Sequence, residues 1–215
     1  MNKIPDRILI ATTNLGKVKE IRDLVKDLPV EFLALSDVEN VPDVVEDGKT
    51  FEENALKKAR HYAQATDLVT LADDSGLCID ALDGRPGVLS ARYAGEHASD
   101  EEKCFRVLDE MRDVPDDRRT AMFVCVLAMA SPLGEEMIFL GTCEGRITRE
   151  QRGTGGFGFD SIFYYEEAGC TFAEMDRESK NQVSHRGLAL RKLATYLARV
   201  NAQAEPFLRA PDANS

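Results

Sequence analysis

Residues 7–17 read RILIATTNLGK, and this stretch decides the class of fold. Arg7 to Ala11 is an apolar run of strand length. From Lys17 onward apolar residues recur at helical spacing, at Val18, Ile21, Leu24, Val25 and Leu28. A strand, a polar loop containing Gly16 and a helix, in this order, direct backbone N–H groups at an anion. The stretch therefore predicts an α/β unit with an anion site at its turn.

The rest of the chain alternates helical and strand patterns. Thr50 opens a helix as T-x-x-E, a capping box, and Ser99 repeats the pattern before a helix that ends near Met111. Residues 120–130 and 136–143 predict a hairpin. Further strands are expected at residues 30–35, 68–72, 77–82 and 162–165, and a last helix from about Ser184. A hairpin among crossover connections predicts a mixed sheet.

Length and composition bound the organisation of the chain. At roughly 150 residues per domain, 215 residues form one large domain or two small lobes. Hydrophobic residues are 43% and charged residues 30%, as in a soluble globular protein rather than a disordered one. We find no internal repeat and no linker. Residues 1–200 are predicted to be a single domain, and residues 201–215, which are polar and contain two prolines, a flexible tail.

The net charge of −11 argues against a nucleic-acid-binding surface, which needs a basic footprint. Local cations and a metal ion can still attract a small anion into a cleft. The longest apolar run, Ala121 to Ala130, is too short to cross a membrane. The five cysteines are odd in number and lack C-x-x-C spacing, which predicts reduced thiols in a cytoplasmic protein.

The loop Thr12–Lys17 has the hydroxyl, amide, glycine and lysine groups that suit a phosphate at a helix N-terminus. It is not a Walker A loop, because Ala11 stands where that motif needs glycine and Val18 follows the lysine. The alternative is an ordinary strand-to-helix turn with a solvated lysine.

Asp73-Asp74-Ser75-Gly76 follows an apolar strand. Adjacent carboxylates repel each other and are costly unless they are exposed or bind a metal. Mg²⁺ prefers one or two carboxylates together with substrate phosphates. The alternative is an Asp-rich turn. Residues 44–48, VVEDG, either supply another metal carboxylate or form an acidic surface loop.

Residues 153–158, GTGGFG, match the G-x-G-x-x-G pattern of dinucleotide-binding proteins. That fingerprint should open a helix, but here it leads into the strand-like FDSIFYY, so a nicotinamide site is disfavoured. Phe157 and Phe159 suit stacking on a base or packing in a core. Lys180, His185 and Arg186 form a basic cluster that indicates an anion or carbonyl partner, or a surface patch.

Taken together, these segments resemble the inosine triphosphate pyrophosphatase family, also called the Ham1 family. TTNLGK, TFEENA, LADDSGL, RPGVLSARYAG, GTGGFGFD and SKNQVSHRG occur in this order over roughly residues 8–197. The resemblance implies an α/β fold, with an elongated mixed β-sheet flanked by helices and two lobes around a central cleft. It also implies a homodimer that hydrolyses ITP, dITP and XTP to monophosphate and pyrophosphate, cleansing the nucleotide pool.

The resemblance also implies the chemistry of the site. Asp74 would be the general base and a ligand of Mg²⁺, and Asp73 would support it as a further metal residue. The family often has a metal-binding glutamate where this chain has Val45. Either the loop shifts so that Glu46 serves as the ligand, or the site relies on Asp74 and substrate oxygens.

The remaining residues implied by the resemblance bind the substrate. Those for the triphosphate are Thr12, Thr13, Asn14, Leu15, Gly16 and Lys17, with Asn54 as a further phosphate contact. Those for the rest of the nucleotide are Ser75, the base-pocket residues Phe157, Gly158, Phe159 and Asp160, the nucleotide contact Lys180, and His185 and Arg186, which read the base carbonyls.

Base selection follows from hydrogen bonding. Inosine and xanthosine carry a 6-carbonyl, which suits a donor such as Arg186, whereas adenine would leave that donor unpaired. GTP must be excluded through its 2-amino group. Rival interpretations are a pyrophosphatase for other modified or pyrimidine nucleotides, like the Maf proteins, and a non-catalytic nucleotide-binding module. The pair Asp73-Asp74 argues against the second, because a pure triphosphate binder gains little from extra negative charge.

Overall fold

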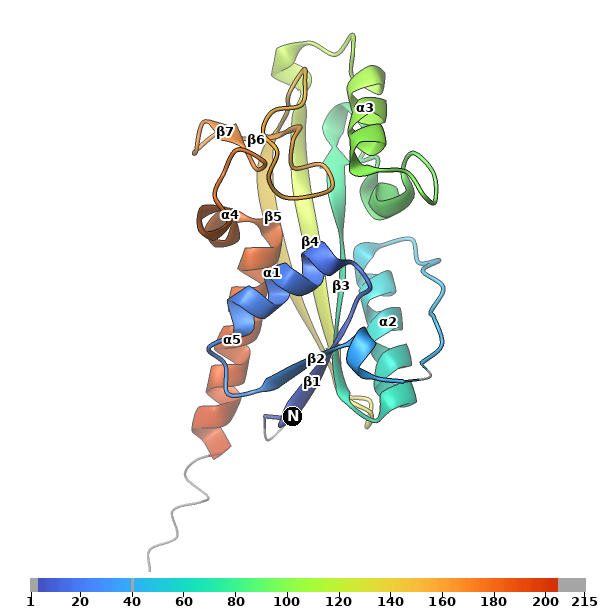
Figure 1. The fold of residues 1–215 in the computed structure, drawn as a ribbon, viewed down its shortest axis with the longest axis vertical. Helices are drawn as coiled ribbons and strands as arrows, with labels where there is room; N and C mark the ends of the chain where they lie inside the picture. The colour runs from blue at the N-terminus through green and yellow to red at the C-terminus, as the bar shows by residue number, and fades with distance from the viewer. Residues whose placement is uncertain (1–3, 40, 205–215) are drawn as a thin grey trace, which may run out of the picture.

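The computed structural model describes residues 4–39 and 41–204 as an elongated mixed α/β fold (Figure 1). Its seven-stranded sheet has the order β2-β1-β3-β4-β5-β6-β7. The strands are β1 Arg7–Ala11, β2 Glu31–Ala34, β3 Val69–Ile79, β4 Thr120–Ala130, β5 Glu136–Ile147, β6 Phe163–Tyr165 and β7 Cys170–Thr171. The helices are α1 Leu15–Val25, α2 Phe51–Thr66, α3 Asp100–Glu110, α4 Arg177–Val183 and α5 His185–Ala204.

The sheet is mixed, as predicted. β1 pairs in parallel with β2 and β3, and every pairing from β3 to β7 is antiparallel. In Figure 1 the long strands β3, β4 and β5 run the height of the molecule. The lower lobe contains β1, β2, α1, α2 and α5; the upper lobe contains α3, β6 and β7. The elongated sheet with two lobes is therefore confirmed.

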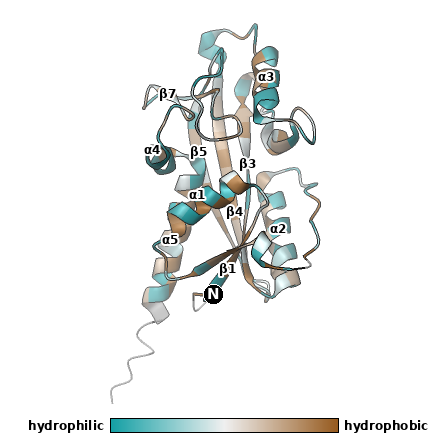
Figure 2. Cartoon of the chain, in the orientation of Figure 1, coloured by the Kyte–Doolittle hydropathy of each residue, from teal (hydrophilic) through white to brown (hydrophobic). Residues whose placement is uncertain are grey.

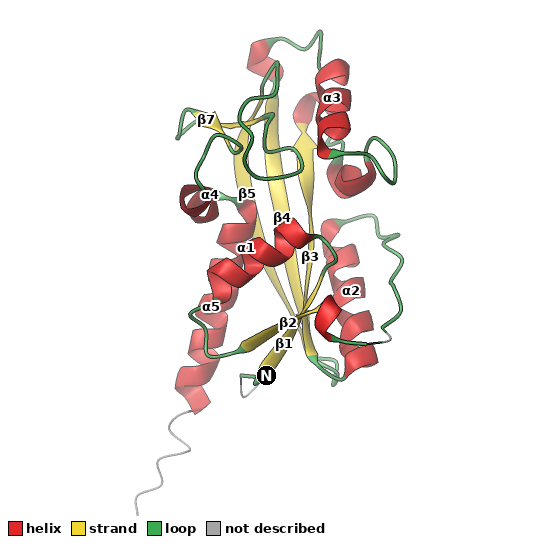
Figure 3. Cartoon of the chain, in the orientation of Figure 1, coloured by secondary structure: helices red, strands yellow, loops and turns green. Residues whose placement is uncertain are grey.

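Alternation along the strands places helices on both faces of the lower sheet (Figure 3). Ile8 and Ile10 of β1 pack in a core with residues of α1 and α5. Leu9 and Ala11, one residue out of phase, pack with residues of α2. Successive side chains of a strand point to opposite faces, so each lower strand must be apolar on both sides.

The upper lobe has its own core. Phe123, Phe163 and Phe172 lie at its centre, with ring centroids 4.5–5.9 Å apart. Cys104 and Val107 bring α3 onto this cluster. Figure 2 shows the hydrophobic colour along β4 and mixed colours along α1, as expected for a buried strand and an amphipathic helix. The long strands thus tie two hydrophobic cores into one sheet.

Most predicted helix starts and strands are confirmed. The Thr50 hydroxyl accepts a hydrogen bond from the Glu53 N–H at 3.1 Å, and Ser99 caps α3 in a complete capping box. The Glu53 carboxylate in turn accepts a hydrogen bond from the N–H of Lys49 rather than from that of Thr50. β4 has the predicted bounds, and β5 extends past the predicted Cys143 to Ile147. No helix in the described part of the chain is long and apolar enough to cross a membrane.

Three local predictions are wrong. The DDSG segment is not a turn between two strands, because β3 runs through it without a break. Residues 177–183 form α4, a helix that was not predicted before the last helix. The last helix continues to Ala204, so the tail does not begin at residue 201; residues 205–215 lie outside the described residues.

Candidate functional site

A cleft lies where the sheet changes from parallel to antiparallel pairing. The last β1–β3 pair is Ala11 with Ala72, and β3 then continues without β1 beside it. The loop that leaves β1, the Glu46 loop and the Phe157 loop line the resulting cleft. Ligands of open α/β sheets bind outside the carboxyl ends of strands, where the strand order reverses. This topology therefore brings the predicted motifs together.

The pleat of β3 separates the two adjacent aspartates. Asp73 is in phase with Leu71, which packs with α1 and α5, and Asp74 is in phase with Ala72, which packs with α2. Their carboxylates therefore point to opposite faces of the sheet. This explains why two acidic residues are tolerated inside a strand: the two charges meet different cations and do not face each other.

Asp73 is fully buried in a network of cations. Its carboxylate accepts hydrogen bonds from Lys17 Nζ and, at 2.8 Å each, from Arg186 Nε and Ser75 Oγ. The Cys125 thiol lies 3.3 Å from the same group. Burial alone would raise the pKa of Asp73, but the charges of Arg186 and Lys17 outweigh it and hold the pKa well below its usual range. Both oxygens are occupied, so the metal role predicted for Asp73 does not match its surroundings.

Glu20 of α1 completes this network and was missed by the sequence analysis. It binds Lys180 Nζ at 2.8 Å and Arg186 Nη1, and Lys180 also binds Asp160 at 2.6 Å. Burial raises the pKa of Glu20, yet Arg186 and Lys180 bring it below its ordinary value. A signal was present in the helical spacing, because Glu20 follows Lys17 by three residues on the same face of α1.

Asp74 lies in a different environment. Lys58 Nζ is 3.8 Å from Asp74 Oδ1, and Asn54 hydrogen-bonds the carboxylate, but the buried Oδ2 has no partner among the described residues. Burial raises the pKa of Asp74 to about 6, against the opposing effect of Lys58. A carboxylate with this pKa and a free oxygen is suited to accept a proton near neutral pH.

In the acidic loop, Glu46 and not Val45 lies in the cleft. Val45 is 71% exposed, whereas Glu46 lines the cleft and binds Lys58 Nζ at 2.9 Å. Arg92 fixes this loop from the upper lobe by donating to the Glu46 carbonyl at 3.3 Å. Asp74 and Glu46 thus share Lys58. The loop places Glu46, rather than residue 45, beside Asp74.

The loop between β1 and α1 lines the same cleft as Asp74. Asn14 caps α1 by accepting from the Lys17 N–H at 3.1 Å. Thr12, Thr13, Asn14 and Lys17 line the cleft, as expected. Leu15, which is 83% exposed, and Gly16 do not line it. A Cβ on Gly16 would lie 2.8 Å from the Phe157 ring, so this glycine permits α1 to pack closely on the aromatic loop.

Aromatic and basic side chains form the opposite end of the cleft. Lys180 Nζ and Arg186 Cζ lie 4.9 and 5.6 Å from the Phe157 ring centroid. His185 stacks on Phe123 at 4.6 Å, and its Nδ1 is buried without a partner among the described residues. Burial and the neighbouring Arg186 lower the pKa of His185 well below its usual range, so the ring is neutral.

Three predicted residues have mainly structural surroundings. Phe159 touches the cleft but is 4% exposed and packs in the upper core. Asp160 binds Lys180 and accepts from the Phe157 N–H at 2.8 Å, which shapes the loop. Asn54 lies outside the cleft lining and accepts from the Gly48 N–H at 2.8 Å, behind Asp74.

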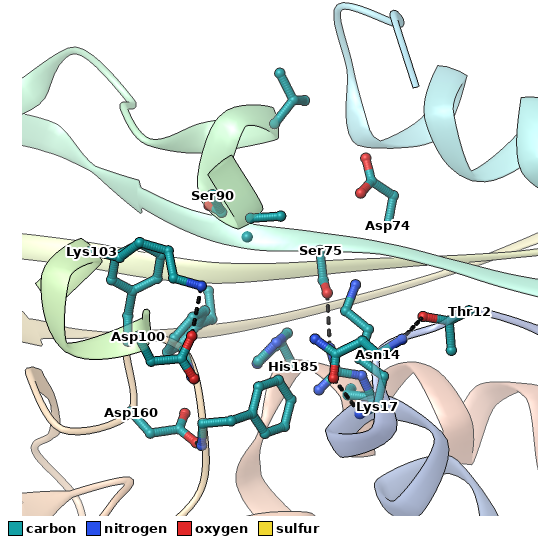
Figure 4. A pocket seen from close by; sticks show the side chains of 18 of the residues that line it. Thr12, Asn14, Lys17, Asp74, Ser75, Ser90, Asp100, Lys103, Asp160 and His185 are labelled. Carbon is teal, nitrogen blue, oxygen red and sulfur yellow. Dashed lines mark hydrogen bonds and ion pairs between the residues drawn. The ribbon is translucent and has the colours of Figure 1, made fainter. Parts of the chain in front are cut away.

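Further cleft residues were not predicted from the sequence. They are Lys58, Gly76, Val88, Ser90, Ala91, Arg92, Asp100, Lys103 and Phe123. Lys58 and Lys103 stand on helices among many other charged residues, so only the fold distinguishes them. Figure 4 shows Asp100 and Lys103 on one side of the pocket, His185 between, and Lys17, Asn14 and Asp74 on the other side.

Mg²⁺ fits one part of this site. Asp74 offers an unpartnered carboxylate oxygen, and Glu46 lies on the same lysine. No group of three or more His, Cys, Asp or Glu side chains within residues 4–39 and 41–204 forms a metal cage. Two carboxylates without a complete cage suit Mg²⁺, which takes its other ligands from water and substrate phosphates.

The chain is similar to known proteins over most of its length. The family model described as the Ham1 family matches residues 8–196. The chain is 52% identical over 191 residues to a dITP/XTP pyrophosphatase of Geobacter sulfurreducens, covering 89% of this chain and 96% of the relative. It is 49% identical over 189 residues to a dITP/XTP pyrophosphatase of Vibrio cholerae, covering 87% and 94%.

Solved structures show the same fold. A HAM1 protein from Coxiella burnetii has a TM-score of 0.83 at 45% identity and covers 90% of this chain and 98% of its own. The Ham1 protein of Staphylococcus aureus has a TM-score of 0.81 at 39% identity, with the same coverage of 90% and 98%.

Proposed function

The chain belongs to the Ham1 family, and from this membership and the geometry of the cleft we propose that it hydrolyses deaminated purine nucleoside triphosphates. The substrates would be ITP, dITP and XTP, and the products a nucleoside monophosphate and pyrophosphate. The observation that carries the proposal is Asp74. Its carboxylate lines a cleft that has a helix N-terminus and Lys17 at one end and an aromatic, basic pocket at the other, and its buried Oδ2 has no hydrogen-bond partner among the described residues.

The triphosphate is placed by charge. The N-terminus of α1 carries a partial positive charge, and Lys17 and Lys58 add two full charges beside it. The side chains of Thr12, Thr13 and Asn14 offer hydrogen-bond partners. In a protein of net charge −11, this local field decides where a polyanion can enter.

Asp74 performs the proton transfer. The Asp74 carboxylate accepts a proton from a water molecule, and the water oxygen forms a bond to the α-phosphorus in line with the leaving group. The bond from the α-phosphorus to the bridging oxygen breaks, and pyrophosphate leaves. Asp74 and Glu46 would hold Mg²⁺, which when bound neutralises charge on the phosphates. Most of the catalysis is positioning and electrostatics, as in other phosphoryl transfers.

The base is selected at the other end of the cleft. Phe157 would stack on the purine ring. Lys180 and Arg186 lie close to the Phe157 ring and therefore close to the bound base. His185 and Arg186, which both line this end of the cleft, would read the 6-carbonyl. Adenine would leave a buried donor unsatisfied there, which discriminates strongly.

Product analysis tests the proposal. The protein is incubated with Mg²⁺ and, separately, dITP, XTP, ATP and dGTP, and products are separated by ion exchange. We expect monophosphate and pyrophosphate from dITP and XTP and little product from ATP or dGTP. Orthophosphate with a diphosphate would mean attack at the terminal phosphorus, and preference for a pyrimidine nucleotide would favour the Maf-like rival. Binding without turnover would favour the binding module.

We also propose that the chain is a cytoplasmic homodimer that acts on free nucleotides rather than on nucleic acid. The family resemblance supports the dimer, and the net charge of −11 supports the absence of a nucleic-acid partner. Sedimentation velocity across a range of protein concentrations tests the dimer. A monomer at every concentration would contradict it.

A further inference from the structure

An ion pair lines the side of the cleft that lies away from Asp74. Lys103 Nζ binds Asp100 Oδ1 at 2.6 Å, and both residues belong to the beginning of α3. The Lys103 side chain is only 12% exposed although it carries a full charge. Both residues line the cleft, and in Figure 4 they lie across the pocket from Lys17 and Asn14. Neither residue is among those predicted from the sequence to bind substrate or metal.

Asp100 fixes this pair to the aromatic loop. Its Oδ2 accepts a hydrogen bond at 2.6 Å from the N–H of Gly158, the residue after Phe157. Burial raises the pKa of Asp100, but Lys103 and the Gly158 N–H outweigh that effect and lower it, so the carboxylate is charged. Lys103 is thereby held beside the loop that carries the stacking ring.

Lys103 differs from the other cations of the base pocket. Lys180 is bound to Glu20 and Asp160, and Arg186 to Glu20 and Asp73, and the side chains of those three carboxylates are at most 8% exposed. The carboxylate partner of Lys103 is 47% exposed. A lysine whose counter-ion is solvated can turn its charge toward a ligand at smaller cost than one locked in a buried network.

The proposed function places the purine next to this lysine. When the triphosphate lies at the α1 N-terminus and the α-phosphorus at Asp74, the base must extend toward Phe157, Gly158 and Asp100. The nucleobase of one substrate, the xanthine of XTP, is a weak acid. Xanthine has a second carbonyl at C2, and its N3–H loses a proton near neutral pH, whereas hypoxanthine lacks that carbonyl and stays neutral there.

We propose that Lys103 is a specificity-determining residue that favours the xanthine monoanion, and hence XTP, over ITP and dITP. This inference rests on the proposed function and deepens it. The charged and titratable groups near Lys103 are Asp100 on its own helix, the Cys104 thiol, and Asp160 of the glycine-rich loop, which is bound to Lys180. The neutral His185 of α5 lines the same cleft. Burial raises the pKa of Cys104 to about 11, so this thiol is neutral as well.

The test is the ratio of kcat/KM for XTP to that for ITP, measured against pH in the full-length protein. In the wild type we expect the ratio to rise as the xanthine base ionises. At pH values above the pKa of the xanthine base, we expect the ratio in Lys103→Met to be about tenfold lower than in the wild type. At pH values below that pKa, the two ratios should be similar. Lys103→Arg should restore most of the pH-dependent preference, because it restores the charge.

Lys57→Met is the matched control. Lys57 is also a helical lysine paired with an aspartate, Asp47, but it lies outside the cleft lining. Its ratio should follow the wild type, and thermal melting checks that each variant is folded. An unchanged XTP-to-ITP ratio in Lys103→Met would overturn the specificity proposal. A wild-type protein that hydrolyses neither XTP nor ITP would instead refute the proposed function, so the two failures are distinguishable.

Discussion

Replacing Glu20 by glutamine removes one negative charge from the buried network and keeps the shape of the side chain. Glu20 binds Lys180 and Arg186, whose side chains are 6% and 2% exposed, so neither cation can turn to water. Removing one partner of a buried ion pair costs about 3–5 kcal/mol. Because Lys180 keeps Asp160 and Arg186 keeps Asp73, we expect the lower end, about 3 kcal/mol.

The assays are urea unfolding and thermal unfolding of Glu20→Gln beside Glu136→Gln. Glu136 binds Arg60 on the surface, where the side chains are 30% and 51% exposed, and loss of such a pair costs about 0.2–1 kcal/mol. At about 2–4 °C per kcal/mol for a chain of this size, Glu20→Gln should lower the Tm by about 6–12 °C. If Glu20→Gln were no more destabilising than Glu136→Gln, the buried network would not stabilise the fold and the reasoning would be wrong.

Three further predictions follow from the site and its surroundings. Asp74→Asn should lower kcat by about 10²–10⁴-fold because it removes the proton acceptor, while nucleotide affinity, measured by calorimetry, largely survives; wild-type turnover would contradict the assignment. The pKa of Glu20 lies below its ordinary value of 4.5, so its charge stabilises the fold above that pH and the contribution is lost as pH falls further. The difference in unfolding free energy between wild type and Glu20→Gln should therefore shrink in acid, and a constant difference would argue against the linkage. Alkylation of the native protein, followed by peptide mass spectrometry, should modify the half-buried Cys170 before the buried Cys104, Cys125 and Cys143, because burial raises the pKa of those three thiols. Early modification of a buried thiol would contradict its packing.

The sequence was informative wherever periodicity or a cap dominates. The β1 run, the hairpin and the capping residues Thr50 and Ser99 could be located because each depends on neighbours in the chain. The loop Thr12–Lys17 and Asp74 could be assigned because their motifs occur together with others in a fixed order. Their close approach in space was implied by the family resemblance and is confirmed for the cleft-lining residues.

The remaining features depend on contacts between distant residues. β3 runs through Asp73 and Asp74 because Lys17, Lys58 and Arg186 compensate the carboxylates, and none of these cations is a neighbour in sequence. Local rules therefore predicted a turn. Lys103 was missed for the same reason: a charged residue on a helix gives no sign of burial until its partners are known. For Glu20 the sequence offered only its spacing of three residues from Lys17.

The opposite orientations of Asp73 and Asp74 have a consequence for protein engineering. Two adjacent residues of one strand have different roles, because the side chain of Asp73 belongs to the buried ionic network and that of Asp74 to the cleft. Substitutions at Asp74 should change the chemistry of the cleft, whereas substitutions at Asp73 should destabilise the fold, because they leave Lys17 and Arg186 without a buried partner. An insertion of a single residue before Asp73 would exchange the two faces and lose both properties together.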